Sequence, residues 1–272
     1  MSGRNPDEIW DESVDEGDRR LSRGTVGLSA TGLVGGVDVM IGVMALTVVS
    51  GALAVSLPEQ IAHVGGSLFF GIGFVLLIVG RSELFTENFL IPVGAVLSGK
   101  RRVVDLLRLW GVTMVANIVA IVVVALILTR AGLVPPETHD AAGKMADTFA
   151  ERDFTSALLS AILAGTTMTL LTWLTHAVER DTGRILVALL IGFVLAAPTL
   201  NHAIVSVGEM TFGLFAGTTE HATWGDLAQN FPVAVLGNVI GGLGFVTLMR
   251  VLQVRGEPDA GDSGDIAVGE SR

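Results

Sequence analysis

Residues 73–88 read GFVLLIVGRSELFTEN, and residues 192–202 read GFVLAAPTLNH. Both stretches begin with the same four residues, 119 positions apart, and both pass from apolar sequence into an abrupt polar interruption. Backbone groups freed by such a break are tolerated at membrane depth only where they are buried in protein or line a wet cavity. The two breaks therefore predict a membrane protein with two interrupted helices and a candidate pore between them.

A second pair of segments indicates that the chain is internally duplicated. Asp105-Leu106 followed by Asn117-Ile118 recurs as Asp226-Leu227 followed by Asn238-Val239, at a spacing of 121 residues. Each copy holds three apolar spans, and because three is odd, the copies must lie upside down relative to each other. Inverted repeats of this kind place a permeation site near the bilayer midplane, between two broken helices.

The apolar stretches are about 20 residues long, which is the length that crosses a hydrocarbon layer of ~30 Å. Half of the 272 residues are hydrophobic and only 16% are charged. We predict an all-α membrane protein with six spans, of which the second and fifth are broken: 28–53, 61–80 resuming at 85–97, 106–128, 157–178, 185–199 continuing to 215, and 231–252.

Composition excludes several other classes of protein. The chain has no cysteine, which rules out a disulfide framework and any cysteine-based metal or redox site. Its net charge of −10 rules out a basic nucleic-acid surface. No HExxH or similar spacing of ligands is present, so we expect no metal site.

Charged residues are concentrated at the two ends of the chain. Residues 1–24 and 253–272 are acidic, and we predict that both are disordered cytoplasmic tails. They flank a transmembrane domain at 25–252, with repeats at about 25–130 and 154–252. Thirteen of the 17 Lys and Arg residues fall on the side of the termini, and such residues are in excess in cytoplasmic segments. We therefore expect a multi-pass plasma-membrane protein with both termini in the cytoplasm.

These features together resemble the formate–nitrite transporter family. The resemblance covers most of residues 25–252 and rests on the six spans, on ELFT at residues 83–86, on Asn201-His202, and on GNVIGG at residues 237–242. It implies an aquaporin-like protomer in the lipid bilayer, assembled as a homopentamer with one pore per subunit. It also implies passage of small monovalent anions such as formate or nitrite, often coupled to protons, without a cofactor.

The resemblance also assigns residues to the pathway. His202 matches a lone histidine in the middle of the pore, and Asn201 adjoins it; Thr86 matches the threonine that bonds to this histidine. Leu84 and Phe85 match an apolar constriction. A bare charge is costly at the bilayer centre, and histidine, with an ordinary pKa near ~6.5, can hand a proton to an anion near physiological pH.

The chain departs from the family pattern at its cations. The family's anion-attracting lysine falls on Phe149, or on Lys144 if residues 149–153 are an insertion. Two roles for Arg81 stay open: it supplies the missing cation, or it joins Glu83 and other acids in a structural ion network. For Asn117 and Asn238 we favour a structural role, satisfying backbone or neighbouring helices, over contact with the permeating species.

Three other functions compete with anion transport. A pore for a neutral small solute or a protonated weak acid is the alternative, because acids lie near the mouth and the usual lysine is missing. An intramembrane enzyme would need a nucleophile and a base on facing helices, and no signature such as GxSxG accompanies the serines near His202. A membrane-anchored scaffold would not require two matched breaks. We therefore predict a transport protein that is not an enzyme.

Overall fold

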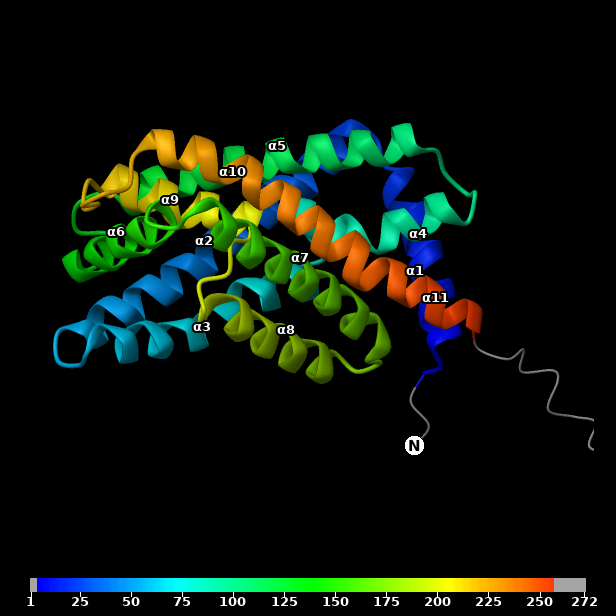
Figure 1. Ribbon diagram of the computed structural model, residues 1–272, viewed down its shortest axis with the longest axis horizontal. Helices are drawn as coiled ribbons and strands as arrows, with labels where there is room; N and C mark the ends of the chain where they lie inside the picture. The colour runs from blue at the N-terminus through cyan, green and yellow to red at the C-terminus, as the bar shows by residue number, and fades with distance from the viewer. Residues whose placement is uncertain (1–3, 257–272) are drawn as a thin grey trace, which may run out of the picture.

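The computed structural model describes residues 4–256, and over that range every regular element is a helix (Figure 1). Five helices are long and apolar enough to cross a membrane: α2 (Thr25–Ala54), α3 (Glu59–Gly80), α5 (Val103–Leu128), α7 (Phe154–Ala177) and the continuous run Trp224–Gly256. This run consists of α10 (Trp224–Val239), the π-helical η2 (Ile240–Thr247) and α11 (Leu248–Gly256). The predicted all-α membrane protein is confirmed at this level.

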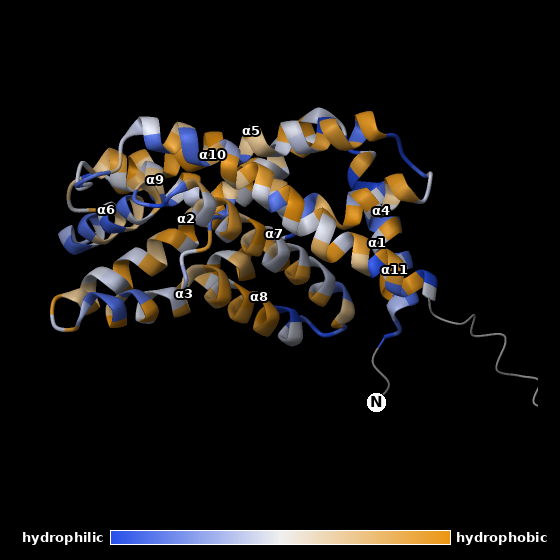
Figure 2. Cartoon of the chain, viewed as in Figure 1, coloured by the Kyte–Doolittle hydropathy of each residue, from blue (hydrophilic) through white to orange (hydrophobic). Residues whose placement is uncertain are grey.

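Hydrophobic residues cover the long helices, whereas hydrophilic residues gather on α1, α6 and the connections (Figure 2). Large apolar side chains remain exposed on the outward faces of α5, α7 and α8, among them Val119, Val123, Leu159, Leu163, Leu186 and Leu190. Such exposure is expected where lipid, and not water, surrounds the helices.

Shorter helices occupy the regions of the two sequence breaks. After α3, the chain forms η1 (Phe85–Phe89) and α4 (Ile91–Leu97); later, residues 197–202 separate α8 (Asp181–Ala196) from α9 (Ala203–Ala216). Arg81 and Thr199, near the starts of the two interruptions, have left-handed backbones with φ of 56° and 52°. A residue in this conformation ends a right-handed helix.

Small residues allow close helix contact next to both breaks. A Cβ on Gly36 of α2 would lie too close to the carbonyl oxygen of Asn117. A Cβ on Gly165 of α7 would overlap the carbonyl oxygen of Asn238. A Cβ on Gly241 would likewise overlap the carbonyl oxygen of Ile162. These contacts bring Asn117 of α5 and Asn238 of α10 within hydrogen-bonding reach of the breaks.

The N-terminal segment corrects the prediction of a disordered tail at residues 1–24. Residues Pro6–Leu21 form α1, which packs on α4 with Ile9, Val14 and Leu21 buried. The Glu8 carboxylate accepts the Asn5 N–H at 3.3 Å, which helps to start the helix. The many acids obscured this apolar face. Of the predicted C-terminal tail, residues 253–256 extend α11, and residues 257–272 lie outside the described range.

At the end of the molecule remote from α1, the helix α6 (Pro136–Ala150) packs on α9 and α2 (Figure 1). Its Asp147 accepts the backbone N–H groups of Glu220, His221 and Ala222 at 2.9, 2.8 and 2.7 Å. Burial alone would raise the pKa of Asp147, but these N–H groups lower it below its ordinary value. Asp147 thereby fastens the α9–α10 connection to α6.

Gly241→Ala should destabilise the protein by about 1–3 kcal/mol, because the added methyl group overlaps the carbonyl oxygen of Ile162. Gly244→Ala is the matched control in the same η2 segment, since a Cβ there meets no atom within 4 Å. Denaturant unfolding in detergent measures both variants. Equal effects of the two substitutions would contradict the packing described.

Asp147→Asn should lower the Tm at neutral pH by about 2–4 °C, because the charged acceptor of three N–H groups is lost. The folded-state pKa of Asp147 lies below the ordinary 3.8, so its stabilisation is present above that value and is lost as pH falls through the folded-state pKa. The Tm difference between wild type and variant should therefore shrink on acidification. A difference independent of pH would refute this assignment.

Candidate functional site

The two breaks touch each other at Thr86 and His202. Thr86 Oγ1 lies 2.5 Å from His202 Nε2, and both residues are fully buried. His202 also begins α9, where its Nδ1 accepts the Val205 N–H at 3.1 Å. Because a backbone N–H can only donate, Nδ1 carries no proton and Nε2 does. The neutral ring therefore donates to the Thr86 oxygen, which leaves the Thr86 O–H free to donate to a further group.

Asn117 satisfies the backbone of the first break from the neighbouring α5. Its Oδ1 accepts the Phe85 N–H at 3.0 Å. Its Nδ2 donates to the carbonyl oxygens of Gly32 and Glu83 at 2.7 and 3.0 Å. Both amide hydrogens are thus used within the protein.

Asn238 repeats this arrangement at the second break. Its Oδ1 accepts the Ala203 N–H at 2.9 Å, and its Nδ2 donates to the carbonyl oxygens of Ala161 and Asn201 at 2.8 and 3.0 Å. Asn117 and Asn238 thus make matching contacts to backbone groups, each from a helix beside one of the breaks.

Asn201 lies beside His202, but its side chain turns to α10. Its Nδ2 donates to Asn230 Oδ1 at 2.8 Å, and Asn230 Nδ2 donates back to Asn201 Oδ1 at 3.0 Å. Asn201 and Asn230 thus form an amide pair that is separate from the contact between Thr86 and His202. The sequence did not single out Asn230, because it precedes the predicted sixth span. Its position four residues after Asp226 places it on the same face of a continuing helix, and this spacing could have identified it.

Apolar side chains surround the contact between the breaks. Leu84 and Phe85 are buried in the largest hydrophobic cluster of the described residues. The Phe85 ring packs edge-on against Phe89 and Trp110, with centroids 5.2 and 6.0 Å apart. The Thr86–His202 pair is therefore a polar contact in apolar surroundings.

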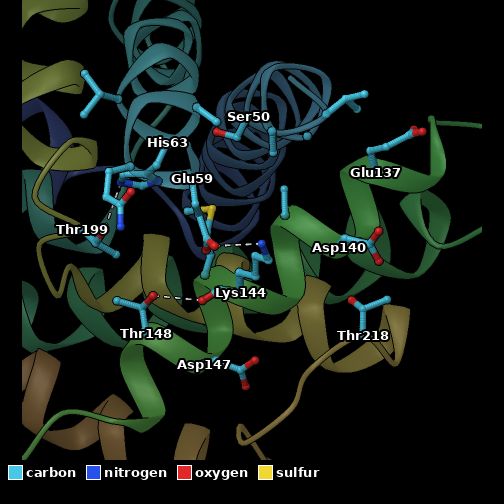
Figure 3. Close-up of a pocket in the computed structure, with 18 of the residues that line it drawn as sticks. Ser50, Glu59, His63, Glu137, Asp140, Lys144, Asp147, Thr148, Thr199 and Thr218 are labelled. Carbon is cyan, nitrogen blue, oxygen red and sulfur yellow. Dashed lines mark hydrogen bonds and ion pairs between the residues drawn. The ribbon is translucent and has the colours of Figure 1, made fainter. Parts of the chain in front are cut away.

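Two cavities approach the breaks from opposite ends of the molecule. The α6 cavity, of about 730 Å³, extends from α6 to Ala197 and Thr199 of the second break (Figure 3). The α1 cavity, of about 380 Å³, lies between α1 and residues 81–83 and 87 of the first break. Each cavity thus reaches one of the two segments that meet at Thr86 and His202.

The two candidate cations of the sequence do not reach this contact. Lys144 is exposed on the wall of the α6 cavity, where its Nζ lies 2.9 Å from Glu59 Oε2 (Figure 3). Arg81 lines the α1 cavity and forms no ion pair with Glu83 within residues 4–256, which corrects the proposed Arg81 network.

A third cation, Arg152, lies at the second break, with Nη2 2.7 Å from the Thr199 carbonyl oxygen. Its place in a connection between predicted spans gave no sign of this contact.

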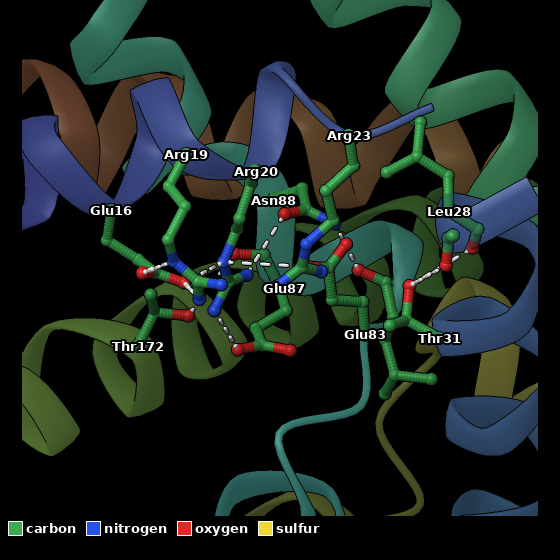
Figure 4. A network of polar contacts seen from close by, with 12 residues as sticks. Glu16, Arg19, Arg20, Arg23, Leu28, Thr31, Glu83, Glu87, Asn88 and Thr172 are labelled. Atoms are coloured by element: carbon green, nitrogen blue, oxygen red, sulfur yellow. Dashed lines mark hydrogen bonds and ion pairs between the residues drawn. The ribbon is translucent and has the colours of Figure 1, made fainter. Parts of the chain in front are cut away.

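The ion network at the first break is instead formed with α1 and the connection that follows it (Figure 4). Arg23 pairs with Glu83, and Arg20 Nη2 lies 3.3 Å from Glu87 Oε1. On α1 itself, burial alone would raise the pKa of Glu16, but bonds to Arg19 and Arg20 lower it to about 2. No group of three or more His, Asp or Glu side chains suited to a metal ion occurs in residues 4–256.

Comparison with known proteins gives matches over nearly the whole chain. A family model described as formate/nitrite transporter matches residues 7–252. The uncharacterized transporter YrhG of Bacillus subtilis (strain 168) is 27% identical over 259 residues, covering 92% of this chain and 93% of that protein. The formate channel BtFdhC of Bacillus thuringiensis is 26% identical over 255 residues, covering 90% and 94%.

Two solved structures share the fold. One, described as an FNT family ion channel, has a TM-score of 0.80 at 19% identity and covers 90% of this chain and 98% of its own. The other, a pentameric formate channel with formate bound, has a TM-score of 0.70 at 20% identity and covers 84% and 97%. At these identities the likeness shows the fold alone.

Asn238→Leu should destabilise the protein by about 3 kcal/mol or more, because one N–H and two carbonyl groups lose their buried partner. Asn230→Leu, a substitution of the same size, removes contacts to side chains only and should have a smaller effect. Thermal unfolding in detergent compares the two. A loss for Asn230→Leu as large as that for Asn238→Leu would contradict the role of Asn238 at the break.

Proposed function

The chain belongs to the formate/nitrite transporter family, and from this membership we propose that it conducts small monovalent anions, such as formate or nitrite, past the Thr86–His202 pair. As a member of this family with several membrane-spanning helices, it is a membrane protein of the transport class. The relative BtFdhC is named a formate channel, which supports formate as a substrate.

The observation that carries the proposal is the meeting of the two breaks between two cavities. An anion entering from either cavity must pass the neck at Leu84 and Phe85, where dehydration is costly. Thr86 offers its O–H at this point, since His202 already donates to its oxygen. A hydrogen bond to a charged acceptor is among the stronger ones, so the pair offsets part of the dehydration cost.

We further propose that His202 transfers a proton to the permeating anion. The resting ring is neutral, and a proton added to Nδ1 displaces the Val205 N–H from it. The resulting imidazolium passes its Nε2 proton through the Thr86 hydroxyl to the anion, which leaves as a neutral acid. Because protonation breaks the first hydrogen bond of α9, an anion beside Thr86 is needed to favour it.

For the membrane topology we propose six crossings in two inverted repeats, with α3 and α4 as halves of the second crossing and α8 and α9 as halves of the fifth. The matched contacts of Asn117 and Asn238 support this pairing. The basic residues on the side of the termini support cytoplasmic ends in the plasma membrane. The pentameric formate channel of the same fold supports a homopentamer.

The lining of the α6 cavity favours a second candidate, the protonated weak acid as the permeating species. Five carboxylates line this cavity with Lys144 as its single Lys or Arg: Glu59, Glu137, Asp140, Asp147 and Glu220. Their negative charge disfavours the approach of an anion. Flux that responds to an imposed membrane potential indicates the anion, and flux that ignores it in wild type and persists in His202→Asn indicates the neutral acid.

His202→Asn tests the central pair in proteoliposomes loaded with formate or nitrite. Asparagine can still accept the Val205 N–H as a helix cap, but it cannot be protonated. Formate flux should fall by about tenfold or more, and the part of its pH dependence that comes from protonation of His202 should disappear. A variant with wild-type flux and pH dependence would refute proton transfer, and absence of flux of either anion in wild type would refute the proposed substrates.

A further inference from the structure

Two buried carboxylates flank the neck residues of the first break. Glu83 precedes Leu84-Phe85-Thr86 and Glu87 follows it, and their exposed fractions are only 1% and 4%. One oxygen of each, Oε2, is buried without a hydrogen-bond partner among the described residues. Without counter-charges, these groups would place negative charge beside the route of an anion and repel it.

The counter-charges come from Arg20 on α1 and from Arg23, which follows α1 in the chain; both lie at least 60 residues away from the carboxylates in the sequence (Figure 4). Arg23 forms an ion pair with Glu83. Arg20 lies between the two carboxylates, with Nη2 3.3 Å from Glu87 Oε1 and Nε 3.7 Å from Glu83 Oε1. Arg20 is itself only 8% exposed, so its charge is placed within the protein and not on its surface.

Other cations of the α1 cavity are engaged elsewhere. Arg19 pairs with Glu16, and Arg184 donates to the Thr175 carbonyl oxygen and to Asp181. Arg81 lines the cavity without an ion pair in residues 4–256. Arg20 and Arg23 are therefore the cations that contact the carboxylates beside the neck.

We propose that Arg20 and Arg23 are specificity-determining residues, which cancel the charges of Glu83 and Glu87 and thereby make the first break passable for anions. On this account α1 belongs to the conducting pathway as its counter-charge element. A helix that merely plugged the mouth would have the opposite effect, because its loosening would raise the flux. The inference rests on the proposed anion transport.

The effect of removing one counter-charge follows from Coulomb's law. An uncompensated carboxylate about 10 Å from the permeating anion, at an effective dielectric constant of about 20, lowers the occupancy of the neck by about tenfold. The screening by salt should be weak, because Glu83 and Glu87 are buried.

The test uses the full chain in proteoliposomes and compares Arg20→Gln with the double variant Arg20→Gln/Glu87→Gln. Arg20→Gln should lower formate flux by about tenfold and reduce the ratio of anion to cation permeability, measured as a reversal potential. The double variant removes the unpaired carboxylate and should restore most of both quantities. A purely structural role of Arg20 predicts no such recovery of selectivity.

Arg101→Gln is the matched control. It removes one charge and one α1 contact, the bond of Arg101 to Asp18 at 2.6 Å, but neither residue lines the α1 cavity. Its flux should stay close to that of wild type. If Arg20→Gln fails to give folded oligomer, Arg23→Gln and Arg23→Gln/Glu83→Gln make the same comparison at the more exposed ion pair.

The outcomes separate this inference from the proposed function. A wild-type protein without anion flux would refute the proposed function itself. Wild-type flux that Arg20→Gln leaves unchanged or increases would overturn the counter-charge role, as would a loss that Glu87→Gln does not reverse. A loss of the same size in Arg101→Gln would also overturn it, since docking of α1 and not charge at the neck would then explain the effect.

Discussion

Unpaired backbone groups inside a membrane protein are the constraint on which this structure depends. α3 ends at Gly80 and α8 ends at Ala196, and the N–H and carbonyl groups of the segments that follow need partners inside the protein. Asn117 and Asn238 supply the missing partners, each with one accepted and two donated hydrogen bonds. Because these bonds fix the backbone of both breaks, side chains carried by the breaks can be held against each other in otherwise apolar surroundings.

The same constraint determines the chemistry of the site. His202 accepts the Val205 N–H at the start of α9, and this bond sets the position of the proton on its ring. The ring therefore faces Thr86 as a donor, and the threonine hydroxyl faces onward as a donor in turn. A helix cap, which in a soluble protein would serve stability alone, here orients the polar pair that we propose for the pathway.

Much of the architecture could be predicted because short stretches of the sequence indicate it. The repeated GFVL and the spaced asparagines indicate two breaks and their supports, and the family resemblance pairs Thr86 with His202. The partner of Glu83 could not be predicted this way, because Arg23 lies 60 residues away and the contact depends on how α1 docks. The acids of α1 also concealed its buried face. Long-range charge pairing needs the fold before it can be assigned.

The central claim is that Thr86 and His202 lie on the route of the anion, between two broken helices. Cryo-electron microscopy of the full chain in lipid nanodiscs with formate tests it most directly. The account predicts density for formate within hydrogen-bonding distance of Thr86 Oγ1, with residues 81–84 and 197–202 non-helical and a passage reaching this point from both cavities. Continuous helices through these residues, or formate crossing the protein along a route that leaves the Thr86–His202 pair buried and untouched, would contradict it.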